Sequence, residues 1–88
     1  MNKLLRITMT HAESGIPTLK LAGELRGEET FELRRACDVL SSPFVVDLTE
    51  LPFADAEGVA ALLGLRARGA ALVGARPYVS LLLEEGTP

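Results

Sequence analysis

The first part of the chain alternates apolar and polar side chains with a period of two. Leu5, Ile7 and Met9 are each followed by a polar residue, which is the spacing of a half-buried β-strand. After the turn residues Glu13-Ser14-Gly15, a second apolar series runs through positions 16, 19, 21 and 25, with Pro17 near its start. Two such strands around a short turn that contains glycine predict an antiparallel hairpin.

From Gly27 onward the apolar period lengthens to that of a helix. Apolar residues then recur at i, i+3, i+4 and i+7, which predicts a helix over 27–40 that ends at Ser41-Ser42-Pro43. A second helix is expected over 56–68, closed by Gly69 in the left-handed conformation. Pro77 should open a third helix, which ends at Gly86.

Two short apolar runs stand between the predicted helices. They are FVVDL at 44–48 and AALV at 70–73, and each is typical of a strand that is covered on both faces. The resulting order is β-β-α-β-α-β-α. It predicts one α/β domain over residues 1–88, with a mixed, mostly parallel four-stranded sheet and three helices packed against it.

Composition excludes several classes of function. The chain has 88 residues and a net charge of −3 with dispersed Lys and Arg, so a nucleic-acid partner is not expected. It has one Cys and one His, which exclude a disulfide framework and a zinc-ligand cluster. No signal-peptide pattern and no apolar run of about 20 residues is present. We therefore expect a cytoplasmic protein that does not insert into a membrane.

Conventional catalytic groups are scarce. His11 falls at the predicted hairpin end, and Cys37 falls on the buried stripe of the 27–40 helix. A buried cysteine usually behaves as a small apolar residue. Nucleotide-binding loops, a G-x-S-x-G sequence and paired catalytic carboxylates are all missing from the sequence. We predict that the protein is not an enzyme and needs neither a metal nor a cofactor.

The segment FADAEGVAALLGL at 53–65 carries the strongest hint of function. Asp55 stands where a helix N-cap belongs, and Glu57 suits the positive end of the helix dipole. Ala60, Ala61 and Gly64 lie where a solvated helix would carry charged residues. Glycine inside a helix costs about 1 kcal/mol relative to alanine. We predict that this small, flat helix face docks another protein.

Three stretches together resemble the STAS domain family (sulfate transporter and anti-sigma factor antagonist) over nearly the full chain. They are LAGELRGEET at 21–30, FVVDLTELPFADAEGVAALLGL at 44–65 and GARPYVSLLLEEG at 74–86. The resemblance implies a regulatory switch or adaptor without catalytic activity. In anti-sigma factor antagonists, a kinase that is also the anti-sigma factor phosphorylates the Ser after the loop Asp. The unphosphorylated domain binds that kinase through this loop and the following helix.

Two positions depart from the family pattern. Asp55 and Gly58 match it, but Ala56 occupies the phosphoacceptor position and offers no oxygen for a phosphate. Arg26 stands where the G-E-L-D pattern has its acid. The partner-binding set that the resemblance implies is Asp55, Ala56, Glu57, Gly58, Ala60, Ala61, Gly64, Arg68 and Arg26.

The leading hypothesis is a stand-alone STAS protein that regulates transcription by binding a kinase-like anti-sigma factor without being phosphorylated at position 56. The alternative is a STAS subunit held by the ATPase subunit of an ABC lipid-transport complex of the Mla type. An enzyme or a small-ligand carrier is a third possibility. The sequence leaves open whether the protein forms a homodimer, and whether Thr49, Ser41 or Ser42 serves as another modification site.

Overall fold

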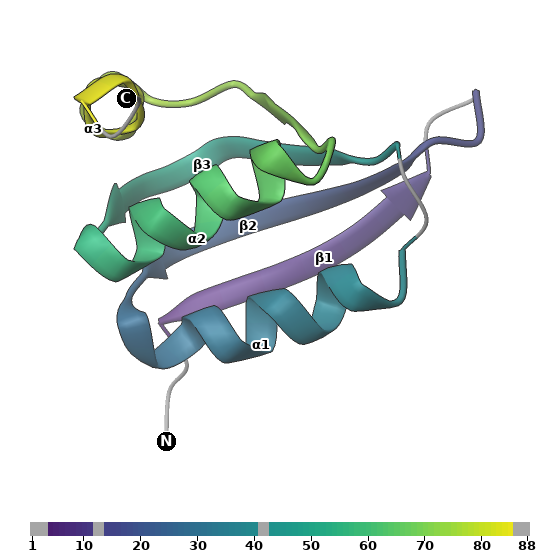
Figure 1. Ribbon diagram of the computed structural model, residues 1–88, viewed down its shortest axis with the longest axis horizontal. Coiled ribbons are helices and arrows are strands. Elements are labelled where there is room, and N and C mark those ends of the chain that lie inside the picture. The colour runs from purple at the N-terminus through teal and green to yellow at the C-terminus, as the bar shows by residue number, and fades with distance from the viewer. Residues whose placement is uncertain (1–3, 12–13, 41–42, 86–88) are drawn as a thin grey trace.

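The computed structural model describes residues 4–11, 14–40 and 43–85. Its elements follow the predicted order (Figure 1): β1 (Leu5–His11), β2 (Pro17–Leu25), α1 (Gly27–Asp38), β3 (Val45–Ala54), α2 (Ala56–Ala67), β4 (Ala71–Val73) and α3 (Pro77–Glu85). Some residues with a predicted role in a turn or at the end of a helix lie outside the described residues: Glu13, Ser41, Ser42 and Gly86.

The four strands form one mixed sheet in the order β1-β2-β3-β4. β1 and β2 pair antiparallel, as the hairpin prediction required, and the other two pairs are parallel. Gly15 in the hairpin turn has a φ of +85°, a conformation that glycine adopts at low cost. The predicted fold class is therefore confirmed.

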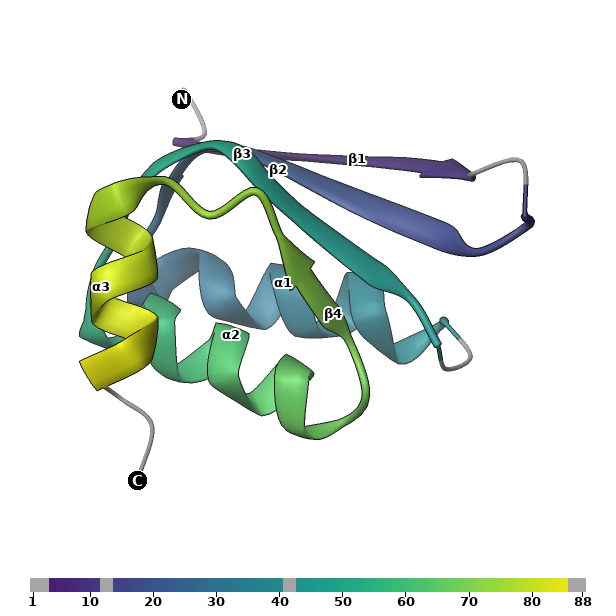
Figure 2. The ribbon, with the colours of Figure 1, turned by 90° about the horizontal axis from the view of Figure 1, so that it is seen from above.

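The helices α1 and α2 lie side by side on one face of the sheet, and α3 packs at its end against β3 and α2 (Figures 1 and 2). The core between sheet and helices is apolar; its largest fully buried side chains include those of Phe44, Leu19, Leu21, Leu48 and Leu62. No described helix covers the opposite face of the sheet, which carries polar pairs such as Lys20–Glu50, whose Nζ and Oε2 atoms are 2.7 Å apart.

This arrangement corrects the prediction that the runs 44–48 and 70–73 are covered on both faces. In β3, Val46 and Leu48 are buried, whereas Val45 and Asp47 point to the open face and are half-buried. In β4, the side chain of Val73 is 42% exposed. Such short apolar runs do not distinguish a central strand from one with a single covered face.

β3 is also longer than the predicted strand. It continues through Thr49 and Pro52 to Ala54, directly before Asp55, which caps α2. We keep the name Asp55 loop for this junction between β3 and α2. β4 pairs only with residues 45–47 of β3, so no described strand pairs with the rest of β3 on that side. An edge position tolerates the missing N–H of proline, and the β2–β3 register shifts twice along this part of the strand.

The predicted ends of α2 are confirmed. Gly69 follows the helix with a φ of +105°, and Ala70 N donates to Leu65 O over 3.0 Å, as in a left-handed helix cap. α3 begins at Pro77 as expected, and α1 ends at Asp38, slightly before the predicted Leu40. Among the described residues, none of the helices has the length and apolar character that crossing a bilayer requires.

Candidate partner-binding site at the Asp55 loop and helix α2

Asp55 joins two helices at their N-terminal ends. Its Oδ1 accepts a hydrogen bond from Gly58 N in α2 at 2.8 Å, and its Oδ2 accepts one from Gly27 N in α1 at 2.9 Å. The first bond confirms the predicted N-cap; the second was not foreseen. Hydrogen bonds from Gly27 N and Gly58 N hold the pKa of Asp55 below its ordinary value, because they favour the ionised carboxylate.

Gly58 is required by packing. A Cβ at this position would stand well under 3.0 Å from the carbonyl oxygen of Leu25, at the end of β2. The glycine therefore lets the first turn of α2 approach the sheet closely. Gly58 was expected to contact a partner protein, but it is buried. It lies beneath the exposed surface of α2 and supports it.

One exposed strip of α2 consists of small, uncharged residues flanked by charges, and Arg66 is exposed outside this strip. Ala56, Ala60, Gly64 and Ala67 are exposed, and no other group lies within 4 Å of the place where a Cβ of Gly64 would stand. Glu57 and Arg68 are exposed at the two ends of this strip. We call these six residues the α2 face. Ala67 was not among the predicted site residues, although its small side chain fits the same pattern.

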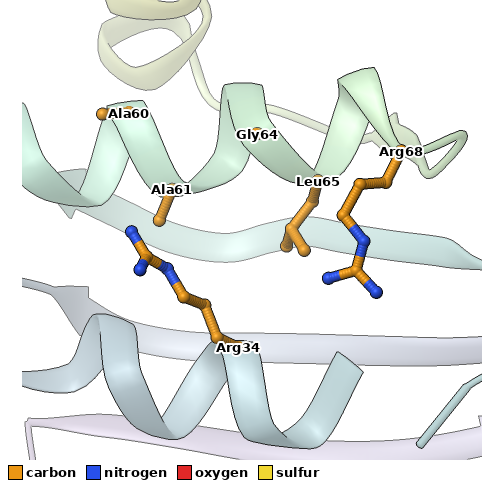
Figure 3. Close-up of a pocket in the computed structure, with 6 residues that line it drawn as sticks. All are labelled: Arg34, Ala60, Ala61, Gly64, Leu65 and Arg68. Atoms are coloured by element: carbon orange, nitrogen blue, oxygen red, sulfur yellow. The ribbon is translucent and has the colours of Figure 1, made fainter. Parts of the chain in front are cut away.

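Ala61 does not belong to the α2 face, which corrects its assignment as an exposed docking residue. Its side chain is only 5% exposed and points toward α1, as does that of Leu65 (Figure 3). The helical period predicts the side of α2 on which Ala61 lies. It does not predict that α1 packs against that side.

A shallow groove of about 240 Å³ runs between α1 and α2 beside the α2 face. It is lined by Arg34, Ala60, Ala61, Gly64, Leu65 and Arg68 (Figure 3). Arg68 Nη1 lies 3.2 Å from Oδ1 of Asp38 on α1. The groove thus has an apolar floor with guanidinium groups at its border.

Arg26 takes part in a separate cluster. Its Nη2 lies 2.8 Å from Glu24 Oε1, and its guanidinium carbon lies 4.9 Å from the centre of the Phe53 ring. Phe53 in turn stacks on Tyr78 of α3, with ring centres 6.0 Å apart. The structure therefore places Arg26 beside the Asp55 loop, with its side chain held by Glu24 of β2 and Phe53 of β3. These residues are far apart in sequence, and no periodic signal links them.

A second groove lies between α2 and α3. It is lined by Ala54, Asp55, Ala56, Val59, Tyr78, Leu82 and Glu85. Ala56, the family's phosphoacceptor position, therefore belongs to the α2 face and also lines this groove, and it is exposed.

The other candidate chemical groups do not line either groove. Cys37 is buried in the core, where burial raises the pKa of its thiol to about 11. His11 is exposed at the end of β1. Thr49 lies in β3, where its hydroxyl donates to Asp47 Oδ1 at 2.5 Å. Within the described ranges, no three His, Cys, Asp or Glu side chains come close enough to hold a metal ion.

Comparison with known proteins identifies the domain. A family model described as "Mlab, STAS domain" matches residues 8–85. The crystal structure of an anti-sigma factor antagonist STAS domain from Rhodobacter sphaeroides is 24% identical, with a TM-score of 0.62 over 84% of this chain and 90% of that one.

An uncharacterised DUF3478 protein with a SpoIIAA-like fold from Shewanella loihica is 17% identical, with a TM-score of 0.53 over 96% and 80% of the two chains. At these identities the two structures show the fold alone. Among curated protein sequences, none matches the chain significantly. Because the family model spans nearly the whole chain, the protein belongs to the STAS domain family.

Proposed function

We propose that this protein is a non-catalytic, cytoplasmic binding module that docks on a kinase-like anti-sigma factor through the Asp55 loop and the α2 face. One observation carries the proposal: the α2 face holds three small, uncharged residues, Ala60, Gly64 and Ala67, between Glu57 and Arg68, while the exposed Arg66 stands outside it. A flat surface of this kind lets a partner approach the helix closely, and contiguous apolar surface is typical of protein-binding sites.

The Asp55 loop supports the proposal by holding this surface in place. Asp55 fixes the start of α2 to the start of α1, and Gly58 lets that turn rest on Leu25. A rigid surface loses little conformational entropy when a partner binds. Ala56 stands at the start of this turn, and its methyl group cannot accept a phosphate. Binding is therefore not interrupted by phosphorylation at position 56.

The second candidate is a STAS subunit held by the ATPase subunit of an ABC lipid-transport complex. The description of the matching family model, "Mlab, STAS domain", favours it, and a permanently held subunit needs no phosphoacceptor at position 56. The same α2 face would be used, so the two candidates differ in the partner and not in the surface.

Calorimetric titration against purified partners tests the proposal. The chain is titrated with a kinase-like anti-sigma factor and, separately, with the transporter ATPase subunit, both from the same genome. If the protein is an anti-sigma factor antagonist, it should bind the anti-sigma factor saturably. If it is a transporter subunit, it should bind the ATPase subunit. Binding to neither would refute both.

Two variants locate the surface in the same assay. Ala60→Glu combined with Gly64→Arg places two large charged side chains on the α2 face, and binding should be lost. Thr8→Arg on exposed β1 is the control, and binding should persist. If the double variant binds as tightly as the wild type, the α2 face is not the interface.

A further inference from the structure

On the exposed surface of α1 and α2, negative charges lie near the N-terminal ends of the helices and positive charges near their C-terminal ends. The two helices have their N-terminal ends together, because Asp55 caps both (Figure 1). Glu28 and Glu57 lie in the first turns of α1 and α2, and all of their counterparts at the other end are arginines except Asp38: Arg35 and Arg66 in the last turns and Arg68 at the end of α2. Glu32 and Arg34 lie at the middle of α1. The surface is therefore acidic at one end and basic at the other.

Between these ends the α2 part of the surface is uncharged and low, and Arg34 of α1 borders it across the groove. Ala60 and Gly64 lie at the middle of the α2 face, and nothing stands within 4 Å of the place where a Cβ of Gly64 would be. On α1, the Phe31 side chain is 68% exposed. Small residues at a helix crossing allow a second helix to pack near the short end of the usual 8–10 Å axis separation.

We propose that this surface packs against the same surface of a second copy of the chain, with the two α2 helices antiparallel. A twofold axis perpendicular to the helices turns the second copy end for end, so its basic end meets the acidic end of the first. Ala60 then packs against Gly64 of the second copy. An electrically polarised surface is complementary to itself only in this orientation.

The pairing of specific charges follows from the same symmetry. The Glu57 carboxylate lies over Gly27 of α1, and Arg68 contacts Asp38 of α1, so both side chains lie on the α1 side of α2. The twofold axis preserves this side and reverses the ends. The twofold axis passes midway between Ala60 and Gly64, and this point is also nearly midway between Glu57 and Arg68. Glu57 of each copy therefore meets Arg68 of the other, so the pair forms twice in each dimer.

Arg68 can bind the second carboxylate while it keeps Asp38. The pair with Asp38 is exposed, and a guanidinium group has five N–H donors in a planar fork. A dimer of this kind covers the α2 face. If the proposed function is correct, self-association therefore competes with the partner protein; the dimer itself does not depend on that function.

Sedimentation equilibrium of the purified chain over a wide concentration range tests the dimer. The wild type should show a monomer–dimer equilibrium that shifts toward monomer as salt rises. Glu57→Arg and Arg68→Glu should each raise the dimer dissociation constant at least about tenfold, because each places like charges opposite each other twice. The double variant should return to within about threefold of the wild type, because the two charges are then exchanged and again complementary.

Two controls separate the interface from general effects. Arg6→Glu makes the same charge change as Arg68→Glu on exposed β1, and the dimer should be unaffected. Gly64→Arg should give a folded monomer by circular dichroism. A wild type that stays monomeric throughout, single variants that dimerise normally, or a double variant that stays monomeric would each overturn the proposal. None of these results depends on the partner titrations.

Discussion

Asp55 and Gly27 are 28 positions apart, yet a hydrogen bond of 2.9 Å joins the carboxylate of the first to the backbone N–H of the second. The other oxygen of the same carboxylate caps α2 through Gly58 N. One side chain therefore satisfies free N–H groups at the starts of two helices. It also fixes the relative position of the two helices that form the candidate binding surface.

Replacing Asp55 by Asn tests this double role. Asn keeps one oxygen, which can accept a hydrogen bond from the backbone N–H of one helix. Its NH2 group then faces the backbone N–H of the other helix, and two donors cannot form a hydrogen bond. We expect the free energy of unfolding to fall by about 1–2 kcal/mol, measured by urea denaturation. Asp38→Asn is the matched control: its carboxylate makes an exposed pair with Arg68, and its loss should cost less than about 0.5 kcal/mol. Equal effects of the two substitutions would contradict the double cap.

The contribution of Asp55 should also depend on pH. Its pKa is lowered in the folded protein, so the unfolded chain takes up a proton first as pH falls. The stabilisation is complete above the ordinary Asp pKa of about 3.9 and is lost as pH falls through the lower folded value. The stability difference between wild type and Asp55→Asn should therefore be constant near neutral pH and shrink at acid pH. A difference that grows on acidification would show that the pKa is raised.

Two glycines of the same helix should respond in opposite directions to alanine. Gly58→Ala should destabilise the protein by about 1–3 kcal/mol, because the new Cβ meets the Leu25 carbonyl oxygen. Gly64→Ala should stabilise it by up to about 1 kcal/mol, because the added methyl meets nothing. Denaturant titration of both variants measures the two effects. A stabilised Gly58→Ala would mean that α2 does not rest on β2 as described.

A charge at position 56 should separate partner binding from stability. Ala56→Glu adds an exposed carboxylate at the first residue of α2, where the helix dipole favours it and neighbouring Glu57 opposes it. We expect a stability change within about 0.5 kcal/mol and at least about tenfold weaker binding of the partner found by titration. Ala56→Gln, of equal size and without charge, is the control. If both variants bind alike, charge at this position does not govern the interface.

Cys37 should be inert in the folded protein. Burial raises the pKa of its thiol to about 11, and its side chain has no exposed surface. Alkylation at pH 8 should therefore be at least about 100-fold slower than for a free cysteine, since the thiolate is the reacting form. In urea the rate should rise to the free value as the protein unfolds. Rapid alkylation of the native protein would show that α1 opens readily.

The fold was predictable because its signals are local. The alternation through Leu5, Ile7 and Met9 and the cap residues Asp55 and Gly69 each act within a few positions. Long-range relationships had no such signal. The bond from Asp55 to Gly27 and the Arg26–Phe53–Tyr78 cluster join segments that meet only in the folded chain.

The errors have the same origin. Ala61 was assigned to the solvent because a helical period does not reveal which neighbour packs on which side; α1 covers it. The run 44–48 was expected to be covered on both faces, although the described helices leave one face of the sheet open. Both errors concern how whole helices are placed relative to the sheet and to each other. The residue pattern of a single segment does not predict that placement.

The methyl group of Ala56 has a consequence for how such a protein could respond to its cell. If the α2 face binds a partner, phosphorylation at position 56 cannot switch that binding, and its occupancy is then set by the concentrations of the chain and its partner. If the chain also pairs with itself, free monomer rises only as about the square root of total protein at high concentration. Doubling its synthesis would then raise the concentration of free monomer only about 1.4-fold, which partly buffers the partner against fluctuations in expression.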